Sequence, residues 1–427
     1  MKNILFAVVA TLCSVSLFAQ EFEERFEDRT LRIDYTFSGN ASEQHVALDR
    51  LSSTNDWWGR RINLTTNPLR GNGDLTIIDK QSGQTIYTTS FSSLFQEWIT
   101  TEEALTVSRS FEFTLLIPMP RNEAIAQLAL RDNTGKESKH SFVINPKDVL
   151  IRDNSNAKPL PYTYIHKGGD SKGTIDVAIL AEGYTANEME LFMEDARITA
   201  EEILSYEPFN SHRDKFNFIA VATPSVDSNV SVPQQGEWRN TAVGSNFMTF
   251  YMPRYLTSSN VYAMYDLVTN IPCEHFVILA NTDTYGGGGI FNSYTLTTAH
   301  HRDFRPVVVH EFGHSFGGLG DEYFYDTNDD NDNMHSITHE PWEPNITTLV
   351  DFNSKWSDMV EEGVETPSAP TKEREENYTV GVYEGGGYLT KGIFRPAVVC
   401  RMRNNTAEHF CPVCERALER VILHQAE

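Results

Sequence analysis

"RPVVVHEFGHSFGGLGDEYFYD" (Arg305–Asp326) is the stretch on which the interpretation of this sequence depends. It contains two histidines four residues apart, a glutamate directly after the first, and glycines followed by adjacent acids. Positions i and i+4 of a helix lie on one face, so His310 and His314 can hold one tetrahedral zinc ion. Glu311 can then reach a water molecule on that ion and act as catalytic base. The pattern predicts a buried helix with a hydrolytic zinc site, in preference to a core helix whose histidines are only hydrogen-bonded.

The third zinc ligand is predicted from the residues that follow the helix. Glycines after the second histidine allow the chain to turn back toward the ion, as in the extended HExxHxxGxxH metzincin motif. At the position of that motif's third histidine the chain has Gly320, and Asp321 and Glu322 come next. We predict Asp321 as the ligand, with Glu322 as the first alternative and a more distant glutamate, Glu340 or Glu343, as the second.

The rest of the chain divides into regions of different pattern. Residues 1–19 have Lys2, an apolar run and the ending "SLFA", which predict a cleaved signal peptide and export to the periplasm, cell surface or medium. Residues 20–150 alternate short β-type runs with turn residues and predict an antiparallel β-sandwich. Residues 151–173 are rich in Pro, Gly and polar residues and predict a linker. A lipid anchor at Cys13 is the less favoured alternative to the signal peptide, because the bulky Leu12 precedes it.

From residue 174 to 427 strand-type and helix-type runs alternate, which predicts an α/β catalytic domain. The helical runs are residues 186–206, "NFMTFYMPRYLT" (246–257) and "NVYAMYDLVTNI" (260–271). The run "YGGGGIFNSYTLTTAH" (285–300) directly before the catalytic helix predicts an edge strand, to which an extended peptide substrate can add. The fold class is therefore a multidomain chain, a β-sandwich followed by an α/β zincin, or metzincin-like, domain.

The charge and the cysteine content limit the classes of partner and of bound metal that the sequence predicts. The formal net charge of −24, with acids scattered along the chain, argues against nucleic acid or an anionic membrane as partner. Removal of the predicted signal peptide with Cys13 leaves four of the five cysteines, which are Cys273, Cys400, Cys411 and Cys414. Structural disulfides or inert thiols are favoured for them, although "CPVC" is also compatible with a second metal or a redox pair. The run "DTNDDNDN" (326–333) offers oxygens for calcium but lacks the glycine and final glutamate of an EF-hand, so a solvated acidic loop is favoured.

The sequence resembles the metallo-type IgA peptidases. The resemblance rests on "HEFGHSFGGLGDEY", "DVAILAEGYTANE", "FNFIAVATPSVDS", "RNTAVGS" and "CRMRNNTAEHFCPVC". It implies the zinc ligands and catalytic base named above and adds Met402 as the methionine of a tight turn beneath the metal. Where family members often have Asp-Ser-Gly, this chain has Asp227-Ser228-Asn229. The resemblance implies no particular substrate.

The sequence thus predicts a secreted zinc endopeptidase that acts on a protein or peptide. One alternative is a surface adhesin or glycan-binding protein in which the sandwich is the functional part, but an intact Glu311 argues for catalysis. A second alternative is a zinc amidase that acts on cell-wall material.

Overall fold

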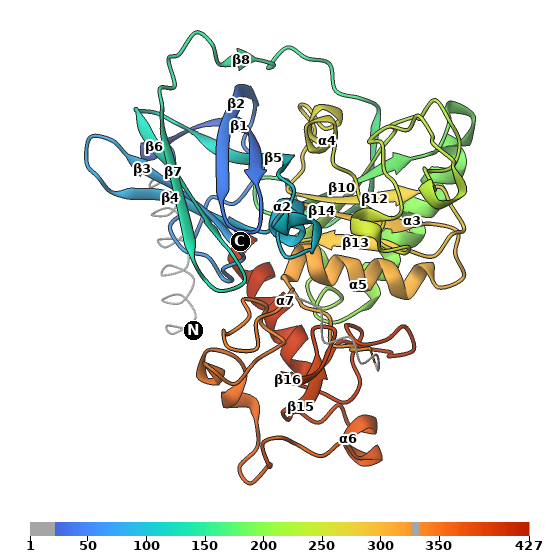
Figure 1. Cartoon of the computed structure of the whole chain (residues 1–427). Helices are drawn as coiled ribbons and strands as arrows, with labels where there is room; N and C mark the ends of the chain where they lie inside the picture. Colours follow the sequence, from blue (N-terminus) through green and yellow to red (C-terminus); the bar gives the residue numbers. More distant parts are fainter. Residues whose placement is uncertain (1–21, 326–333, 427) are drawn as a thin grey trace, which may run out of the picture.

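The computed structural model describes residues 22–325 and 334–426. The predicted signal peptide, the lipid-anchor alternative at Cys13 and the calcium-loop candidate (326–333) lie outside the described residues. Within the described part of the chain, no helix combines the length and apolar character needed to cross a bilayer. Figure 1 shows the N-terminal strands (blue to teal) beside a larger sheet with its helices (green to orange), and the C-terminal segment (orange to red) below both.

The N-terminal region consists of two four-stranded sheets that share one hydrophobic core. The strand orders are β5-β1-β2-β8 and β4-β3-β6-β7. Rings from both sheets meet in the core, with the centroid of Phe113 lying 4.5 Å from that of Phe91 and 4.9 Å from that of Phe37. The elements of this region are β1 (Phe26–Gly39), β2 (Gln44–Asn55), β3 (Gly73–Asp79), β4 (Thr85–Phe91), α2 (Leu94–Trp98), β5 (Arg109–Pro120), β6 (Ala124–Arg131), β7 (Glu137–Ile144) and β8 (Arg152–Asp153).

The second region is built on a six-stranded sheet of order β13-β14-β12-β10-β11-β9. The four central strands run parallel, and the edge strands β13 and β9 are antiparallel to their neighbours. Successive residues of the central strands enter two different apolar cores, as expected for a sheet covered on both faces. The strands are β9 (Tyr162–Lys167), β10 (Ile175–Glu182), β11 (Phe216–Val221), β12 (His275–Ala280), β13 (Gly287–Ile290) and β14 (Tyr294–Thr298).

Helices cover this sheet, and a C-terminal segment completes the region. Helices α3, α5 and α7 contribute to one core and α4 to the other. Their bounds, with those of the remaining elements, are α3 (Met189–Ser205), α4 (Val261–Leu267), α5 (Phe304–Gly317), α6 (Lys372–Glu376), α7 (Pro412–Gln425), β15 (Tyr383–Gly386), β16 (Leu389–Arg395) and the 3₁₀ turns η1 (Glu103–Leu105), η2 (Ala186–Glu188), η3 (Arg213–Lys215), η4 (Pro233–Gln235), η5 (Thr249–Tyr251), η6 (Phe352–Ser354) and η7 (Ser357–Met359).

Two local predictions are wrong. The predicted linker contains β9, which pairs with β11 at the sheet edge; its short alternating run "YTYIHK" is flanked by prolines and glycines that dominated the sequence pattern. The predicted helix at 246–257 is only the turn η5, with Met248, Phe250 and Tyr251 in the left-handed region. Pro253 interrupts a helix there, and hydrogen bonds to neighbouring segments replace the helical ones.

The turn Asp227–Asn229 shows how the chain accommodates asparagine at the position where the family resemblance suggests glycine. Asn229 has a φ of 71°, in the left-handed region, and asparagine is one of the few residues other than glycine that adopts this conformation readily. Its backbone N–H donates to the carbonyl of Gly183 at 2.9 Å. Asparagine thus provides the left-handed conformation of this turn.

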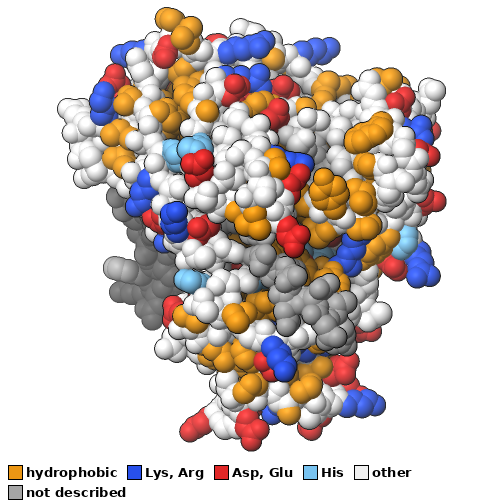
Figure 2. All heavy atoms as spheres, viewed as in Figure 1, with side chains coloured by type: hydrophobic (Ala, Val, Ile, Leu, Met, Phe, Trp, Pro, Cys, Tyr) orange, Lys and Arg blue, Asp and Glu red, His pale blue; other side chains and the backbone are white. Residues whose placement is uncertain are grey.

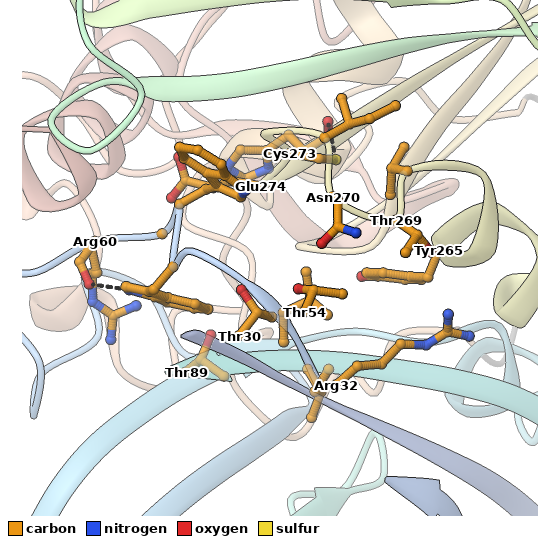
Figure 3. A pocket seen from close by; sticks show the side chains of 18 of the residues that line it. Thr30, Arg32, Thr54, Arg60, Thr89, Tyr265, Thr269, Asn270, Cys273 and Glu274 are labelled. Atoms are coloured by element: carbon orange, nitrogen blue, oxygen red, sulfur yellow. Dashed lines mark hydrogen bonds between the residues drawn. The ribbon is translucent and has the colours of Figure 1, made fainter. Parts of the chain in front are cut away.

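The two regions pack against each other at the hairpin β13–β14. The Ser92 N–H donates to the Phe291 carbonyl at 2.9 Å, and the Phe291 N–H donates to Ser92 Oγ at 3.0 Å. A cavity of about 110 Å³ also lies between the regions, with Arg32 and Arg60 on one side and Cys273 and Glu274 on the other (Figure 3). The histidines of the quoted motif do not line it. Charged side chains of both signs are dispersed over the face in Figure 2, which agrees with the scattered acids of the sequence.

Candidate metal centre

Helix α5 carries the quoted motif and presents both histidines on one face. The Nε2 atoms of His310 and His314 lie 3.0 Å apart. Asp321 Oδ1 lies 3.0 Å from the Nε2 of His310 and 3.4 Å from that of His314. Two donors held about 2.0–2.1 Å from a tetrahedral zinc ion are separated by about 3.3 Å, so these three atoms have the spacing that such an ion requires.

The other ring nitrogens fix the orientation of the two imidazoles. His310 Nδ1 lies 3.1 Å from the Arg401 carbonyl and His314 Nδ1 lies 2.5 Å from that of Leu319. Because a carbonyl only accepts, each Nδ1 carries the proton and each Nε2 lone pair faces Asp321. Asp321 Oδ1 is buried and has no hydrogen-bond partner among the described residues. A cation is favoured between these atoms, because two nitrogen lone pairs and one unpaired carboxylate oxygen face one another there.

The return of the chain toward the histidines depends on Gly318 and on one buried asparagine. Helix α5 ends at Gly317, and Gly318 follows with a φ of 60°, a left-handed C-cap that suits glycine. Gly317 itself is needed for packing, since a Cβ there would lie 2.5 Å from Leu418 Cδ2. Asn345 then accepts from the Gly320 N–H at 2.7 Å and donates to its carbonyl at 2.9 Å. The turn thereby directs Asp321 back to the helix.

The alternative third ligands lie elsewhere. Glu322 points away from the histidines into a buried group of cysteines. Glu343 lines the same cleft as the histidines, while Glu340 accepts from the Asp351 N–H at 2.9 Å. Neither glutamate belongs to the group of converging donor atoms, which consists of His310, His314 and Asp321.

The predicted base, Glu311, lies against the glycine run of β13. A Cβ on Gly287 would be 2.7 Å from Glu311 Oε1, so only glycine leaves room for this carboxylate. Burial raises the pKa of Glu311, and the neighbouring histidines partly oppose that shift. Burial lowers the pKa of His314, but the Asp321 carboxylate outweighs this and raises it to about 9 when a proton rather than a metal ion binds the Nε2 lone pair. The local field thus favours positive charge beside Asp321.

Met402 lies beneath the helix in a tight turn. The backbone N–H of Arg403 donates to the Cys400 carbonyl at 2.9 Å and closes this turn. Met402 is fully buried, and a Cβ on Gly313 would lie 2.8 Å from its sulfur. The turn therefore supports the part of α5 that lies between the two histidines.

The histidines open into a cleft of about 750 Å³, and several of its polar groups were not anticipated from sequence. Tyr388 donates its hydroxyl to Asp321 Oδ2. The guanidinium of Arg254 donates to the Tyr323 hydroxyl at 3.0 Å and lies over the Tyr323 ring. Glu97, from α2 of the N-terminal region, also lines the cleft. Apart from the position of Tyr323 next to the acid pair, no motif marks these residues, because they are far apart in sequence.

The predicted edge strand lies along the cleft but is partly paired. Its glycines line the cleft, and it forms one edge of the six-stranded sheet. On its outer side, however, the Gly287 N–H donates to the Arg254 carbonyl and the Gly287 carbonyl accepts from the Leu256 N–H, both at 3.3 Å. Only the outward backbone groups near Gly289 remain for strand addition. Ile290 faces β14 in the antiparallel register, so a proline there would disturb the hairpin.

Comparison with known families defines the class of this protein as a peptidase. Residues 163–378 and 369–422 match the family described as IgA Peptidase M64, and residues 21–142 match the one described as Peptidase M64 N-terminus. The chain therefore belongs to the IgA peptidase M64 family. No curated protein matches it.

Proposed function

We propose that this chain is an exported zinc endopeptidase in which an N-terminal β-sandwich precedes a metzincin-like catalytic domain. The observation that carries the proposal is the convergence of His310 Nε2, His314 Nε2 and Asp321 Oδ1 in a cleft that also contains Glu311. Three protein donors with one side open to the cleft are typical of catalytic rather than structural zinc sites. Export rests on the signal peptide expected from the sequence.

His310, His314 and Asp321 would hold the zinc ion. When bound, such an ion supplies Lewis-acid chemistry, polarising the scissile carbonyl and making water nucleophilic near neutral pH. Glu311 accepts the proton of the attacking water on its carboxylate and passes it to the nitrogen of the leaving amine. Its burial supports this role because a carboxylate whose pKa is raised accepts a proton from water more readily than an exposed one.

Other residues of the cleft bind the substrate or orient a metal ligand. Tyr388 holds the outer oxygen of Asp321, which leaves Oδ1 directed at the ion. Arg254 and Tyr323 offer a cation and a hydroxyl for the negative charge that develops on the carbonyl oxygen. An extended substrate runs along the outer side of β13 near Gly289, where the outward backbone groups can hydrogen-bond to a peptide backbone. Glu97 extends the cleft onto the N-terminal region.

The test is digestion of casein and of a peptide library by zinc-loaded protein. Cleavage should stop with a zinc chelator and return with added zinc, and internal bonds should be cut. Fully zinc-loaded protein that leaves casein and the library intact would contradict the proposal. If it instead released peptides from cell-wall material, the amidase alternative would replace it.

A further inference from the structure

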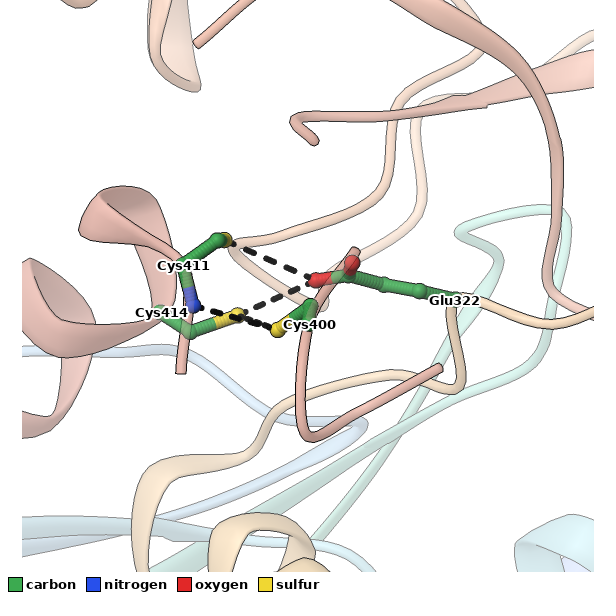
Figure 4. Close-up of side chains that lie close together, drawn as sticks. All are labelled: Glu322, Cys400, Cys411 and Cys414. Atoms are coloured by element: carbon green, nitrogen blue, oxygen red, sulfur yellow. Dashed lines mark hydrogen bonds between the residues drawn. The ribbon is translucent and has the colours of Figure 1, made fainter. Parts of the chain in front are cut away.

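A second group of ligand-type side chains lies behind the cleft, outside the machinery described above. It consists of Glu322, Cys400, Cys411 and Cys414, which we call the thiol cluster (Figure 4). All four side chains are fully buried, and one donor atom of each lies within 4.8 Å of the others. The loop after α5, the Met402 turn and the start of α7 are thus brought together at one point.

The distances within the thiol cluster match a tetrahedral site. Cys400 Sγ and Cys414 Sγ lie 3.8 Å apart. Glu322 Oε1 lies 3.1 Å from Cys414 Sγ and 3.9 Å from Cys411 Sγ. Sulfurs bound about 2.3 Å from a tetrahedral zinc ion are separated by about 3.8 Å. Small shifts of these side chains would therefore complete the coordination shell.

The buried carboxylate of Glu322 favours a bound cation at the thiol cluster. Glu322 Oε2 is buried without a hydrogen-bond partner among the described residues, while Oε1 accepts from Asn345 at 3.0 Å. The nearby buried Arg395 donates instead to the carbonyls of Glu384 and Gly385. A carboxylate in this position is unfavourable unless a positive group pairs with it. A metal ion at the centre of the cluster would supply that group.

Burial raises the pKa of the Cys400 and Cys414 thiols, and the backbone around the sulfurs opposes this shift. The N–H of Cys411 lies 3.2 Å and that of Met402 lies 3.4 Å from Cys400 Sγ, and both donate to it. Cys411 is the N-cap of α7 and Cys414 lies in its first turn, where the helix dipole stabilises negative charge. Thiolate is the form in which cysteine binds metals.

A disulfide explains the thiol cluster less well than a metal does. A disulfide joins two of the three sulfurs and leaves the third buried beside Glu322. The fourth cysteine, Cys273, does not belong to the cluster and lines the cavity between the two regions instead (Figure 3). No described cysteine is therefore placed to pair with the third sulfur, whereas one ion uses all four donors.

We propose that Glu322, Cys400, Cys411 and Cys414 bind a structural zinc ion, separate from the cleft site. Three thiolates and one carboxylate in a closed four-donor set suit zinc better than magnesium or calcium, which prefer oxygen donors. The ion would join the loop after α5 to the Met402 turn, where the Glu322 N–H already donates to the Met402 carbonyl at 2.9 Å. The neighbouring Arg401 carbonyl orients His310. The thiol cluster thus supports the cleft ligands without touching substrate.

The first test counts zinc and thiols in the purified protein without the predicted signal peptide, residues 20–427, which contains four of the five cysteines. Zinc per chain is measured by elemental analysis and native mass spectrometry, and thiols are titrated in denaturant with a chelator. Two zinc ions and four thiols per chain are expected. One zinc ion with only two thiols would establish a disulfide and overturn the proposal, as would four thiols with no zinc after dialysis against zinc. These outcomes do not depend on any variant folding. If one ion is found with four thiols, the second test decides which site holds it.

The second test assigns each ion to its site. Cys414→Ser removes a ligand of the thiol cluster, and His310→Ala removes a ligand of the cleft site. Each variant should therefore retain one zinc ion, at the other site. Cobalt bound to His310→Ala should give the intense near-ultraviolet thiolate-to-cobalt band, which is absent from cobalt-loaded Cys414→Ser. Two zinc ions in Cys414→Ser, or no thiolate band in His310→Ala, would contradict the assignment. Because the readouts are metal content and spectra, failure of the thiol cluster and failure of the peptidase mechanism are distinguishable.

Discussion

Asp321 and Glu322 are adjacent carboxylates that enter two different groups of ligand-type side chains. Asp321 meets two imidazoles at the edge of a cleft of about 750 Å³, whereas Glu322 meets three cysteines in the interior. The first group has three donors and an open side; the second has four donors and none. An open coordination position is what separates a catalytic site from a structural one. The contrast shows that access and donor number, rather than carboxylate chemistry, distinguish the two positions.

The sharpest test of the open site is Glu311→Gln. The amide keeps the size of the side chain but cannot accept the proton, so kcat for a fluorogenic peptide should fall about 10²–10⁴-fold. The zinc content should equal that of the wild type, because Glu311 does not belong to the converging donor atoms. A variant that keeps its zinc and the wild-type kcat would exclude Glu311 as the base.

The comparison of the two carboxylates is tested by Asp321→Asn and Glu322→Gln. Residues that only orient a metal ligand contribute about 10–100-fold to affinity, so replacing the charged ligand Asp321 should weaken zinc in the cleft by more than about 100-fold. Glu322→Gln should change the affinity of the cleft far less. Competition with a chromogenic chelator measures the zinc affinity of each variant. Peptidase activity in the same titration reports the occupancy of the cleft site. Equal weakening in both variants would remove the distinction between the sites.

Tyr388→Phe tests the hydroxyl that holds Asp321 Oδ2. Loss of this hydroxyl should weaken zinc binding in the cleft by about 10-fold, at the lower end of the range for groups that orient a metal ligand. Excess zinc should then restore most of the activity. Tyr383→Phe is the matched control, because its hydroxyl donates to the Thr379 carbonyl and not to a cleft carboxylate. If both variants bound zinc like the wild type, Tyr388 would have no part in positioning Asp321.

The smallest expected effect is that of Met402→Leu. Leucine nearly conserves the buried volume, so the free energy of unfolding should fall by less than about 1.5 kcal/mol. Chemical denaturation measures this change, and both zinc ions should remain. A loss of zinc from this variant would instead give the methionine sulfur a direct role at the metal.

Some parts of the molecule were predictable because they depend on local periodicity. The helical spacing of His310 and His314 and the end of the helix at Gly317 follow from residues close together in sequence. The alternation of strands and helices after residue 174 likewise predicted an α/β domain, although β9 of its six-stranded sheet lies before that residue. The linker and the helix at 246–257 were predicted wrongly, because pairing with distant strands overrode the local pattern.

The sequence by itself determined the helix that carries His310, Glu311 and His314, the family, and the small set of acids from which a third donor could come. Only the tertiary structure decided that Asp321 turns to the histidines while Glu322 turns to the cysteines. It also decided that Glu97 of the N-terminal region lines the cleft. The physical reason is that one left-handed residue, Gly318, and one buried side chain, Asn345, set the direction of the loop after α5. Neighbouring side chains on such a loop point to opposite sides, and nothing in the local pattern tells which side faces the metal.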